Sequence, residues 1–166
     1  MNNKILIIIP VLAVIVVAML VLQNTISDYD VVAVRDQSFY SDAIKIDDVI
    51  IDVQIADTVV KRDRGLMFQE QMPYDQGMLF IYEELGNYAF WMYNMGFSLD
   101  IIWFDENGNT VHIKRDVPPC STEPEYCDVY DPGAKALYVF EATAGFADRF
   151  GITEDSKFSW IVDKTS

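Results

Sequence analysis

The chain has 166 residues and carries 26 Asp and Glu residues against 12 Lys and Arg residues, which gives a formal net charge of −14. All the acidic residues follow residue 22, so this portion repels phosphate backbones and anionic lipid headgroups, and we expect no nucleic acid partner. The simplest role of the excess acid is to keep the protein soluble, and the remaining length suits one domain with a sizeable core.

An apolar run from Ile5 to Leu22 opens the chain. As a helix its roughly 18 residues would span about 27 Å, close to the hydrocarbon thickness of a bilayer. Lys4 precedes the run, and Asp28 and Asp30 follow it, so the positive-inside bias leaves the N-terminus in the cytoplasm and exports the rest. We therefore expect a transmembrane anchor at residues 1–22, which contacts the cell membrane through residues 5–22.

A cleaved signal peptide is the alternative to an anchor. Its apolar region is usually shorter, about 7 to 15 residues, and it ends in a small-x-small cleavage site. Residues 21–25 read Val-Leu-Gln-Asn-Thr and contain no such site. The uncleaved anchor is therefore the preferred interpretation.

The next segment, residues 23–45, mixes polar and apolar side chains with weak periodicity and contains two Ser-Asp pairs. We expect a spacer here, followed by a folded extracytoplasmic domain over residues 46–166. From Val49 to Ala56, apolar residues recur at every second position, which is the period of a half-buried strand. Asp57 or Thr58 can then cap a short helix through Arg64, with Gly65 as its stop signal.

Further short apolar runs predict strands, and turn residues separate them. The Asn107-Gly108 pair is a hairpin signal between two of these runs. A second short helix fits residues 145–150, closed by Gly151. The pattern predicts a mainly β domain, a compact sandwich or jelly roll with one or two short helices. The expected strands cover residues 78–82, 88–92, 99–104, 110–113, 137–141 and 158–162.

The two cysteines, Cys120 and Cys127, lie in a proline-rich segment that we expect to be a loop outside the membrane. An oxidising compartment and this spacing make an intramolecular disulfide the default. A zinc site would need two more ligands, and the only histidine, His112, is expected in a strand. A redox-active pair would more typically be spaced C-x-x-C, so we expect neither metal nor redox chemistry here.

Several short motifs follow one another in a fixed order between residues 45 and 162. They are Ala56-Asp57-Thr58, Arg62-x-x-Gly65-Leu66-Met67, Gly77-Met78-Leu79-Phe80, Phe90-Trp91-Met92-x-Asn94, Leu99-Asp100-Ile101-Ile102, Asp105-x-x-Gly108, Pro119-Cys120, Tyr138-Val139-x-Glu141 and Gly145. In these motifs the chain resembles the family called domain of unknown function 192. The resemblance implies a compact, mainly β domain of the jelly-roll kind that often follows a signal or anchor. It implies no activity and no cofactor.

The chain departs from the family pattern at three places. Tyr93 stands where a basic residue often follows Met92, Ser98 replaces a proline that often precedes the Leu-Asp pair, and Glu154-Asp155 stands for a Gly-Asp pair. If the basic residue serves a ligand in the family, this chain lacks that contact.

The polar members of the motifs, Arg62, Asn94, Asp100 and Glu141, are the candidate binding residues. A polar group in an apolar core must be paired, so one interpretation is that they brace the fold, with Arg62 reaching a carboxylate. The other is that Arg62, Asn94 and Asp100 line a cleft that recognises a small polar ligand. Trp91 joins the candidates because alternation places Trp91 and Tyr93 on one side of a strand, where their rings could stack on a ligand.

Catalysis is the less favoured hypothesis. Asp100 and Glu141 could act as acid and base in glycoside hydrolysis, and only their separation decides this. The sequence has no nucleophile elbow, phosphate loop or His-Glu-x-x-His motif, so we name no catalytic residue and expect no cofactor. The Asp105 loop lacks the glycine that a calcium-binding EF-hand requires at its sixth position, which leaves the hairpin as its explanation.

The sequence therefore predicts a single-pass membrane protein with its domain outside the cell. Its leading function is a noncatalytic module that binds a small polar ligand or an envelope component. The alternatives are an extracytoplasmic hydrolase and a structural subunit that meets a membrane-protein partner through residues 1–45.

Overall fold

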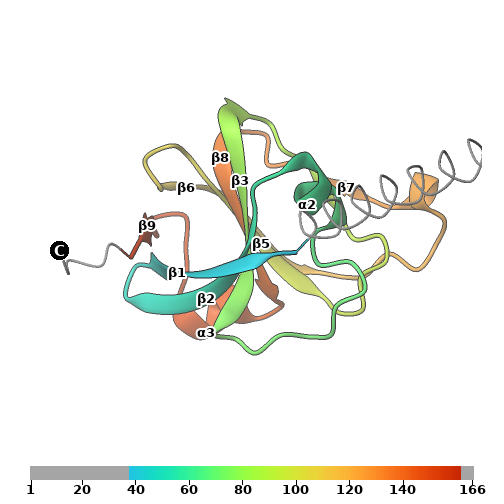
Figure 1. Cartoon of the computed structure of the whole chain (residues 1–166), viewed down its shortest axis with the longest axis horizontal. Coiled ribbons are helices and arrows are strands. Elements are labelled where there is room, and N and C mark those ends of the chain that lie inside the picture. The colour runs from blue at the N-terminus through green and yellow to red at the C-terminus, as the bar shows by residue number, and fades with distance from the viewer. Residues whose placement is uncertain (1–37, 162–166) are drawn as a thin grey trace, which may run out of the picture. The chain divides into compact units, whose positions relative to one another are not determined.

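The structure is a computed structural model that describes residues 38–161 (Figure 1). The expected anchor at residues 1–22 lies outside the described residues, as does the spacer up to residue 37. Between residues 38 and 161, no helix has both the length and the apolar character needed to cross a membrane.

The main feature of the domain is a seven-stranded sheet with the strand order β6-β5-β8-β3-β2-β1-β9. Its neighbours are antiparallel except β2 and β3, which are parallel because α2 (Val59–Arg64) lies in the connection between them. A two-stranded ribbon pairs β4 (Phe90–Trp91) with β7 (Val129–Tyr130). The sheet strands are β1 (Tyr40–Ile46), β2 (Val49–Ala56), β3 (Gln76–Gly86), β5 (Leu99–Phe104), β6 (Thr110–Val117), β8 (Ala136–Thr143) and β9 (Phe158–Trp160).

The sheet is curled, so its two edges meet at one end. Asn109, just before β6, pairs with Lys157, just before β9, and the Thr110 hydroxyl donates to the Ser156 carbonyl oxygen at 2.7 Å. Register shifts in the β3–β8 and β5–β6 pairs add local twist to the strands. The expectation of a mainly β domain with short helices is confirmed. The strands, however, form one curled sheet with a small ribbon rather than two sheets of similar size.

Both sides of the central strands are buried, so alternate residues enter two separate cores. On one side, the α3 face, Leu79 of β3 and Phe140 of β8 pack against Phe146 of α3 (Phe146–Phe150). On the other side, the α2 face, Phe80 and Val139 pack with Leu66 from the segment after α2, and the β4–β7 ribbon lies against them. Figure 1 shows α2 and α3 on different sides of the sheet.

Local signals in the sequence placed several elements correctly. The Thr58 side chain accepts a hydrogen bond from the Lys61 amide and caps α2, which ends at Gly65 with a φ of 48°. The Asp105 side chain accepts hydrogen bonds from the Asn107 and Asn109 amides in the β5–β6 turn. This turn confirms the hairpin interpretation, because the carboxylate is used within the loop.

Two features of the fold differ from or extend what the sequence predicted. β1 begins at Tyr40, within the stretch expected to be spacer, and it pairs with β2 along its whole length. Its first three residues are exposed and only Ile44 and Ile46 are fully buried, so its apolar pattern is too short to detect. The expected disulfide joins Cys120 and Cys127, and it closes a loop that contains the short 3₁₀ helix η1 (Pro124–Tyr126).

Candidate functional site

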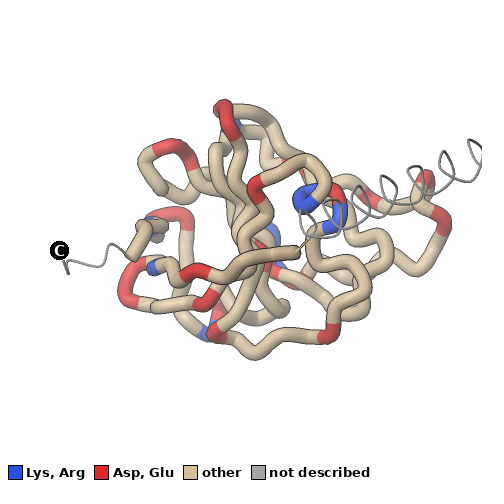
Figure 2. The backbone as a smooth tube through the Cα atoms, in the orientation of Figure 1, with Lys and Arg blue, Asp and Glu red and all other residues tan. Residues whose placement is uncertain are grey.

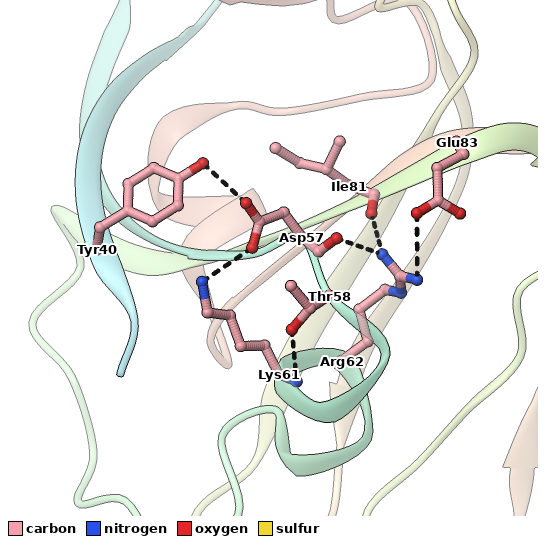
Figure 3. Close-up of polar contacts among 7 residues, drawn as sticks. All are labelled: Tyr40, Asp57, Thr58, Lys61, Arg62, Ile81 and Glu83. Carbon is pink, nitrogen blue, oxygen red and sulfur yellow. Dashed lines mark hydrogen bonds and ion pairs between the residues drawn. The ribbon is translucent and has the colours of Figure 1, made fainter. Parts of the chain in front are cut away.

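The N-terminal end of α2 is fixed by a polar cluster (Figure 3). Asp57 accepts hydrogen bonds from Lys61 Nζ at 3.0 Å and from the Tyr40 hydroxyl at 3.2 Å, so it ties α2 to β1. Burial alone would raise the pKa of Asp57, but the hydrogen bonds and the charge of Lys61 outweigh it and lower the pKa. These contacts fix the position of α2 relative to β1.

Arg62 extends from α2 onto β3 and is mostly committed to backbone oxygens. Its Nη1 donates to the Asp57 carbonyl at 2.9 Å and to the Ile81 carbonyl at 2.7 Å (Figure 3). Its guanidinium carbon lies 4.9 Å from the Tyr82 ring centre, and the exposed Glu83 is 4.0 Å from Nη2. Arg62 therefore braces the fold, through carbonyl oxygens more than through the carboxylate that the sequence suggested.

Figure 2 shows how the charges are placed: acidic residues are scattered along the loops and strand ends, whereas α2 carries a group of basic residues. These are Lys61, Arg62 and Arg64, with Asp63 between them. The region near α2 therefore carries both signs of charge on a chain that is acidic overall.

Glu141 is the unusual residue of the α2 face. It lies on β8 between Met78 of β3 and Ile101 of β5, and only 4% of its surface is exposed. Among the described residues none donates a hydrogen bond to its carboxyl group, and burial raises the pKa of this group to about 8. A buried carboxyl without a donor costs several kcal/mol when it ionises, which is rare unless a site uses it.

The Glu141 side chain lines a small cavity of about 30 Å³. Among the described residues, every side-chain oxygen that is sealed from solvent has a hydrogen-bond partner. The Glu141 oxygens receive no hydrogen bond from the described residues, so they keep some contact with solvent, in agreement with the cavity that Glu141 lines. The walls of the cavity are mainly apolar and come from the segment after α2, from β3, and from β4 and the turn that follows it: Leu66, Met67, Phe80, Phe90, Tyr93 and Met95.

A wider surface groove of about 280 Å³ adjoins the cavity, because the two share Arg62, Asp63, Phe90 and Trp91. Tyr82 also lines the groove, and burial raises the pKa of its hydroxyl, with the Arg62 charge opposing this. We call the cavity and groove together the α2–β4 pocket. It consists of an aromatic groove and a smaller cavity that one buried carboxyl group, Glu141, helps to line.

Three of the five candidate binding residues therefore come together in the α2–β4 pocket: Arg62, Trp91 and Glu141. Trp91 is 42% exposed, and its ring centre lies 5.4 Å from that of Tyr93, as the strand alternation predicted. Met92 is buried in the core of the α2 face, and Phe90 packs against this core while it also lines the pocket. Trp91 is thus free to contact a ligand.

Asn94 lies beside the pocket and has a backbone role. Its φ is 57°, a left-handed conformation that asparagine tolerates, and its carbonyl accepts from the Phe68 amide at 3.0 Å. Phe68 has a φ of 62° and is 80% exposed, which is uncommon for a bulky side chain. These two residues join the segments that carry Met67 and Tyr93, so they set the shape of the pocket.

Asp100 is not in the pocket, contrary to the cleft hypothesis. It is 1% exposed on the α3 face, where Oδ1 accepts from the Asp116 amide at 2.9 Å and Oδ2 accepts from the Ala147 amide at 2.8 Å. The first bond holds Asp116 of β6, whose φ is 48°. The second satisfies the Ala147 amide in the first turn of α3. Asp100 is a structural brace with both oxygens occupied.

The proposed acid–base pair is wrong for the same reason. Asp100 of β5 lies opposite Ala142 of β8, whereas Glu141 lies opposite Ile101. Successive side chains on a strand point to opposite faces, so the two carboxyl groups lie on opposite sides of the sheet. They cannot flank one glycosidic bond, and the hydrolase hypothesis that depends on them fails.

Several residues of the pocket were not among the candidates predicted from the sequence, above all Tyr82, Asp63 and Arg64. Asp63 and Arg64 are neighbours of Arg62 on a short helix, so their position beside Arg62 is the signal that could have indicated them. Tyr82 lies two residues after Phe80 and so faces the same side of β3. That relation is visible in the sequence only once β3 is known to border α2.

Two other regions are weaker candidates. A hollow of about 450 Å³ beside β1 and β2 is lined by Asp42, Asp52 and Gln54, none of them fully buried. It is larger than the α2–β4 pocket but contains no buried polar group without a partner. Within residues 38–161, no group of three or more His, Cys, Asp or Glu residues is arranged to hold a metal ion. His112 packs 5.5 Å from the Trp103 ring centre in its strand.

Known proteins are similar to this chain in sequence and in fold. The DUF192 family, described as "Uncharacterized ACR", matches residues 43–160. A UPF0127 protein of Thermococcus sibiricus (strain DSM 12597 / MM 739) is 30% identical over 112 residues, which cover 68% of each chain. One from Thermococcus gammatolerans (strain DSM 15229 / JCM 11827 / EJ3) is 28% identical over 110 residues, or 66% of this chain and 67% of that one.

Two crystal structures are similar in fold. A proposed transcription regulator from Sinorhizobium meliloti 1021 has a TM-score of 0.67 and 25% identity, over 74% of this chain and 95% of that one. A protein of unknown function from Novosphingobium aromaticivorans DSM 12444 has a TM-score of 0.66 and 23% identity, over 72% of this chain and 85% of that one. The sequence motifs, the family match and the fold agree, and the chain belongs to the DUF192 family.

Proposed function

We propose that this domain is a noncatalytic binding module and that its α2–β4 pocket holds a small polar ligand. The observation that carries the proposal is the Glu141 carboxyl group, which belongs to a residue only 4% exposed, reaches a cavity, and receives no hydrogen bond from the described residues. Such a group gains most from a ligand that supplies the missing partner. Trp91 and Tyr82 would contact the rest of the ligand in the groove.

Binding is favoured over hydrolysis because, within residues 38–161, no second buried carboxyl group accompanies Glu141 on its own face. Asp63 borders the pocket but is exposed at the surface of α2. Glycosidases need two carboxyl groups on either side of one bond, in one site. A single buried carboxyl group suits recognition of a ligand more than turnover.

The regulator description of the Sinorhizobium meliloti protein does not change this proposal. A formal net charge of −14 opposes a nucleic acid partner for this chain. The basic residues of α2 are too few and too closely mixed with Asp57, Asp63 and Glu83 to form a phosphate-binding stripe.

The location is part of the proposal. Residues 5–22 would anchor the chain in the cell membrane, and the domain would act outside it, near other envelope components. Two features support this: the apolar run itself, and the Cys120–Cys127 disulfide, which persists mainly in oxidising compartments. Protease added to intact cells should cleave the domain. Protection of the domain, or co-purification with an integral membrane partner through residues 1–45, would favour a different topology or a structural subunit.

Thermal melting of the full-length chain in detergent, against a panel of small sugars, amines, amino acids and short peptides, tests the binding proposal. A ligand at a hundred times its Kd adds about 2.7 kcal/mol, which moves a domain of this size by several degrees. The shift should disappear in Glu141→Gln and persist in the control Glu83→Gln, whose carboxyl group is exposed. If no compound in the panel shifts the melting temperature of the wild type, the proposed function is wrong.

A further inference from the structure

The chemistry around Glu141 narrows the class of ligand. The cavity beside it is lined by apolar and aromatic side chains and by the charged residues of α2, and Glu141 is the buried carboxyl group among them. A carboxylate can accept hydrogen bonds but cannot donate them. The aromatic walls attract positive charge through their ring faces. Both features favour a cation that carries several N–H donors.

We propose that the α2–β4 pocket binds a primary alkylammonium group, with the –NH₃⁺ end against the Glu141 carboxylate and the alkyl stem along Leu66, Phe80 and Phe90. This inference rests on the proposed function and specifies its ligand. The group belongs either to a small free amine or to a lysine side chain, since both present the same chemistry to the pocket.

The size of the cavity selects this group among organic cations. At about 30 Å³ the cavity is much smaller than the adjoining groove of about 280 Å³, so it suits the narrow end of a ligand. A compact –NH₃⁺ group fits such a space and makes up to three hydrogen bonds. A planar guanidinium or a quaternary ammonium is bulkier than an –NH₃⁺ group and fits the narrow cavity less well. The wider groove of about 280 Å³ would hold the part of the ligand beyond the alkyl stem.

The charged and titratable groups near the pocket are compatible with a cation. From α2 come Arg62, Asp63 and Arg64, from β3 comes Tyr82, and Tyr93 follows β4. The Arg62 guanidinium is used by the Asp57 and Ile81 carbonyl oxygens, and Arg64 lies 5.0 Å from the Phe39 ring centre. These two positive charges weaken the attraction, whereas Asp63 and the net charge of −14 attract amines to the surface.

The position of Glu141 at the cavity and its raised pKa together predict how amine binding depends on pH. The pKa of Glu141 is raised to about 8, so the group is mostly protonated at about pH 6 and mostly ionised at about pH 9. An alkylammonium stays charged in this range, because its pKa is near that of lysine, about 10.4. Binding at neutral pH must therefore release the Glu141 proton. As the pH rises toward the pKa of Glu141, the apparent Kd should fall by up to about tenfold for each pH unit.

Isothermal titration calorimetry of the full-length chain with n-propylamine and with the neutral isostere n-propanol tests this inference. We expect n-propylamine to bind more tightly at about pH 9 than at about pH 6 by at least tenfold, and n-propanol to bind weakly with no such gain. Titration at neutral pH in two buffers with different ionisation enthalpies should show proton release without the use of any variant. Glu141→Gln should lose the amine binding, and the control Glu83→Gln should keep it.

The source of the group is tested by a second pair of probes, the diamine cadaverine and a blocked tripeptide with a central lysine. Tighter binding of one of the two than of n-propylamine identifies that source. If n-propanol and n-propylamine bind equally and both need Glu141, the ammonium inference is wrong while the binding function stands. If amine binding survives in Glu141→Gln, the amines bind the acidic surface only and the inference is overturned. If the melting panel also fails, both proposals are wrong.

Discussion

The two faces of the sheet each contain one buried carboxyl group, and the two groups have opposite surroundings. On the α3 face, Asp100 accepts two backbone hydrogen bonds, at 2.9 Å and 2.8 Å, from segments far apart in the sequence. On the α2 face, Glu141 accepts none from the described residues, and burial raises its pKa to about 8. Both residues are almost fully buried, at 1% and 4% exposure.

This contrast indicates which buried polar residues are candidates for function. A buried carboxylate that is fully hydrogen bonded is explained by the fold it stabilises. One that lacks a donor and reaches a cavity makes the folded state less stable when ionised, so its presence points to a ligand. Burial alone does not separate the two cases, whereas the number of hydrogen-bond donors does.

The largest effect is expected from Asp100→Ala. The substitution leaves the amides of Asp116 and Ala147 without acceptors, and each loss of this kind costs about 1–3 kcal/mol, so the free energy of unfolding should fall by about 4 kcal/mol. Chemical denaturation measures the change. A loss below about 1 kcal/mol would mean that Asp100 does not brace α3 and β6.

The next effect is a gain in the free energy of unfolding, and it depends on pH. Between a pH of about 4.5 and about 8, folded Glu141 keeps a proton that the unfolded chain has lost, so this residue makes stability fall as pH rises through that window. The Glu141→Gln substitution removes this pH-dependent loss of stability. Near pH 4 the variant should match the wild type, and near pH 9 it should be more stable, on the order of 3 kcal/mol.

Denaturant midpoints of both proteins across this pH range test the prediction. Asp100→Asn serves as the matched control, because it changes the buried carboxyl group on the other face. This variant should be less stable than the wild type at every pH in the range. A difference between Glu141→Gln and the wild type that stays constant with pH would show that Glu141 has an ordinary pKa, and the contrast between the two faces would disappear.

The disulfide belongs to the α2 face, so its loss should affect that face more than the other. The Cys120 amide donates to the Met92 carbonyl at 2.9 Å, and β7 after the disulfide loop pairs with β4, which carries Trp91. Replacing both cysteines with serine should reduce the free energy of unfolding by about 2.5 kcal/mol, as expected for closing so short a loop. Hydrogen exchange should rise at β4 and β7 first. Equal exchange on the α3 face would contradict this.

The smallest of these effects is expected from Arg62, which lines the pocket but has its hydrogen bonds satisfied. Arg62→Ala leaves the Ile81 carbonyl without its 2.7 Å donor and removes the packing on Tyr82, at a cost of about 2 kcal/mol. Arg62→Lys keeps the charge and should recover only part of this, because the lysine side chain is one bond shorter and lacks the planar group that packs on Tyr82. Full recovery in Arg62→Lys, measured by thermal melting, would assign Arg62 an electrostatic role instead.

Much of the local structure could be predicted because short-range chemistry determines it. Thr58 caps the start of α2 and Gly65 ends it, as the sequence predicted. The Asp105 turn joins β5 and β6, as its Asn-Gly pair indicated. The disulfide and the outward position of Trp91 were predicted from spacing and alternation in the same way. Each of these depends on residues within about ten positions of one another.

The site could be predicted only in part. Arg62, Trp91 and Glu141 were named from their motifs, but Asp100 was grouped with them although it lies on the other side of the sheet. A shift of one residue in register between β5 and β8 would have placed the two carboxyl groups on the same face of the sheet. No pattern within either strand reports that register, because both strands are buried on both faces.

Neighbouring residues and their backbone preferences establish the order of strands and turns, the caps of α2, the cysteine pair and the family motifs, so all of these can be read along the chain. Packing in three dimensions was needed to curl the strands into one sheet, to begin β1 at Tyr40, and to place Glu141 at a cavity and Asp100 at two amides. The Asp100 contacts join residues 16 and 47 positions apart, and such contacts depend on packing and register, which the local sequence does not record.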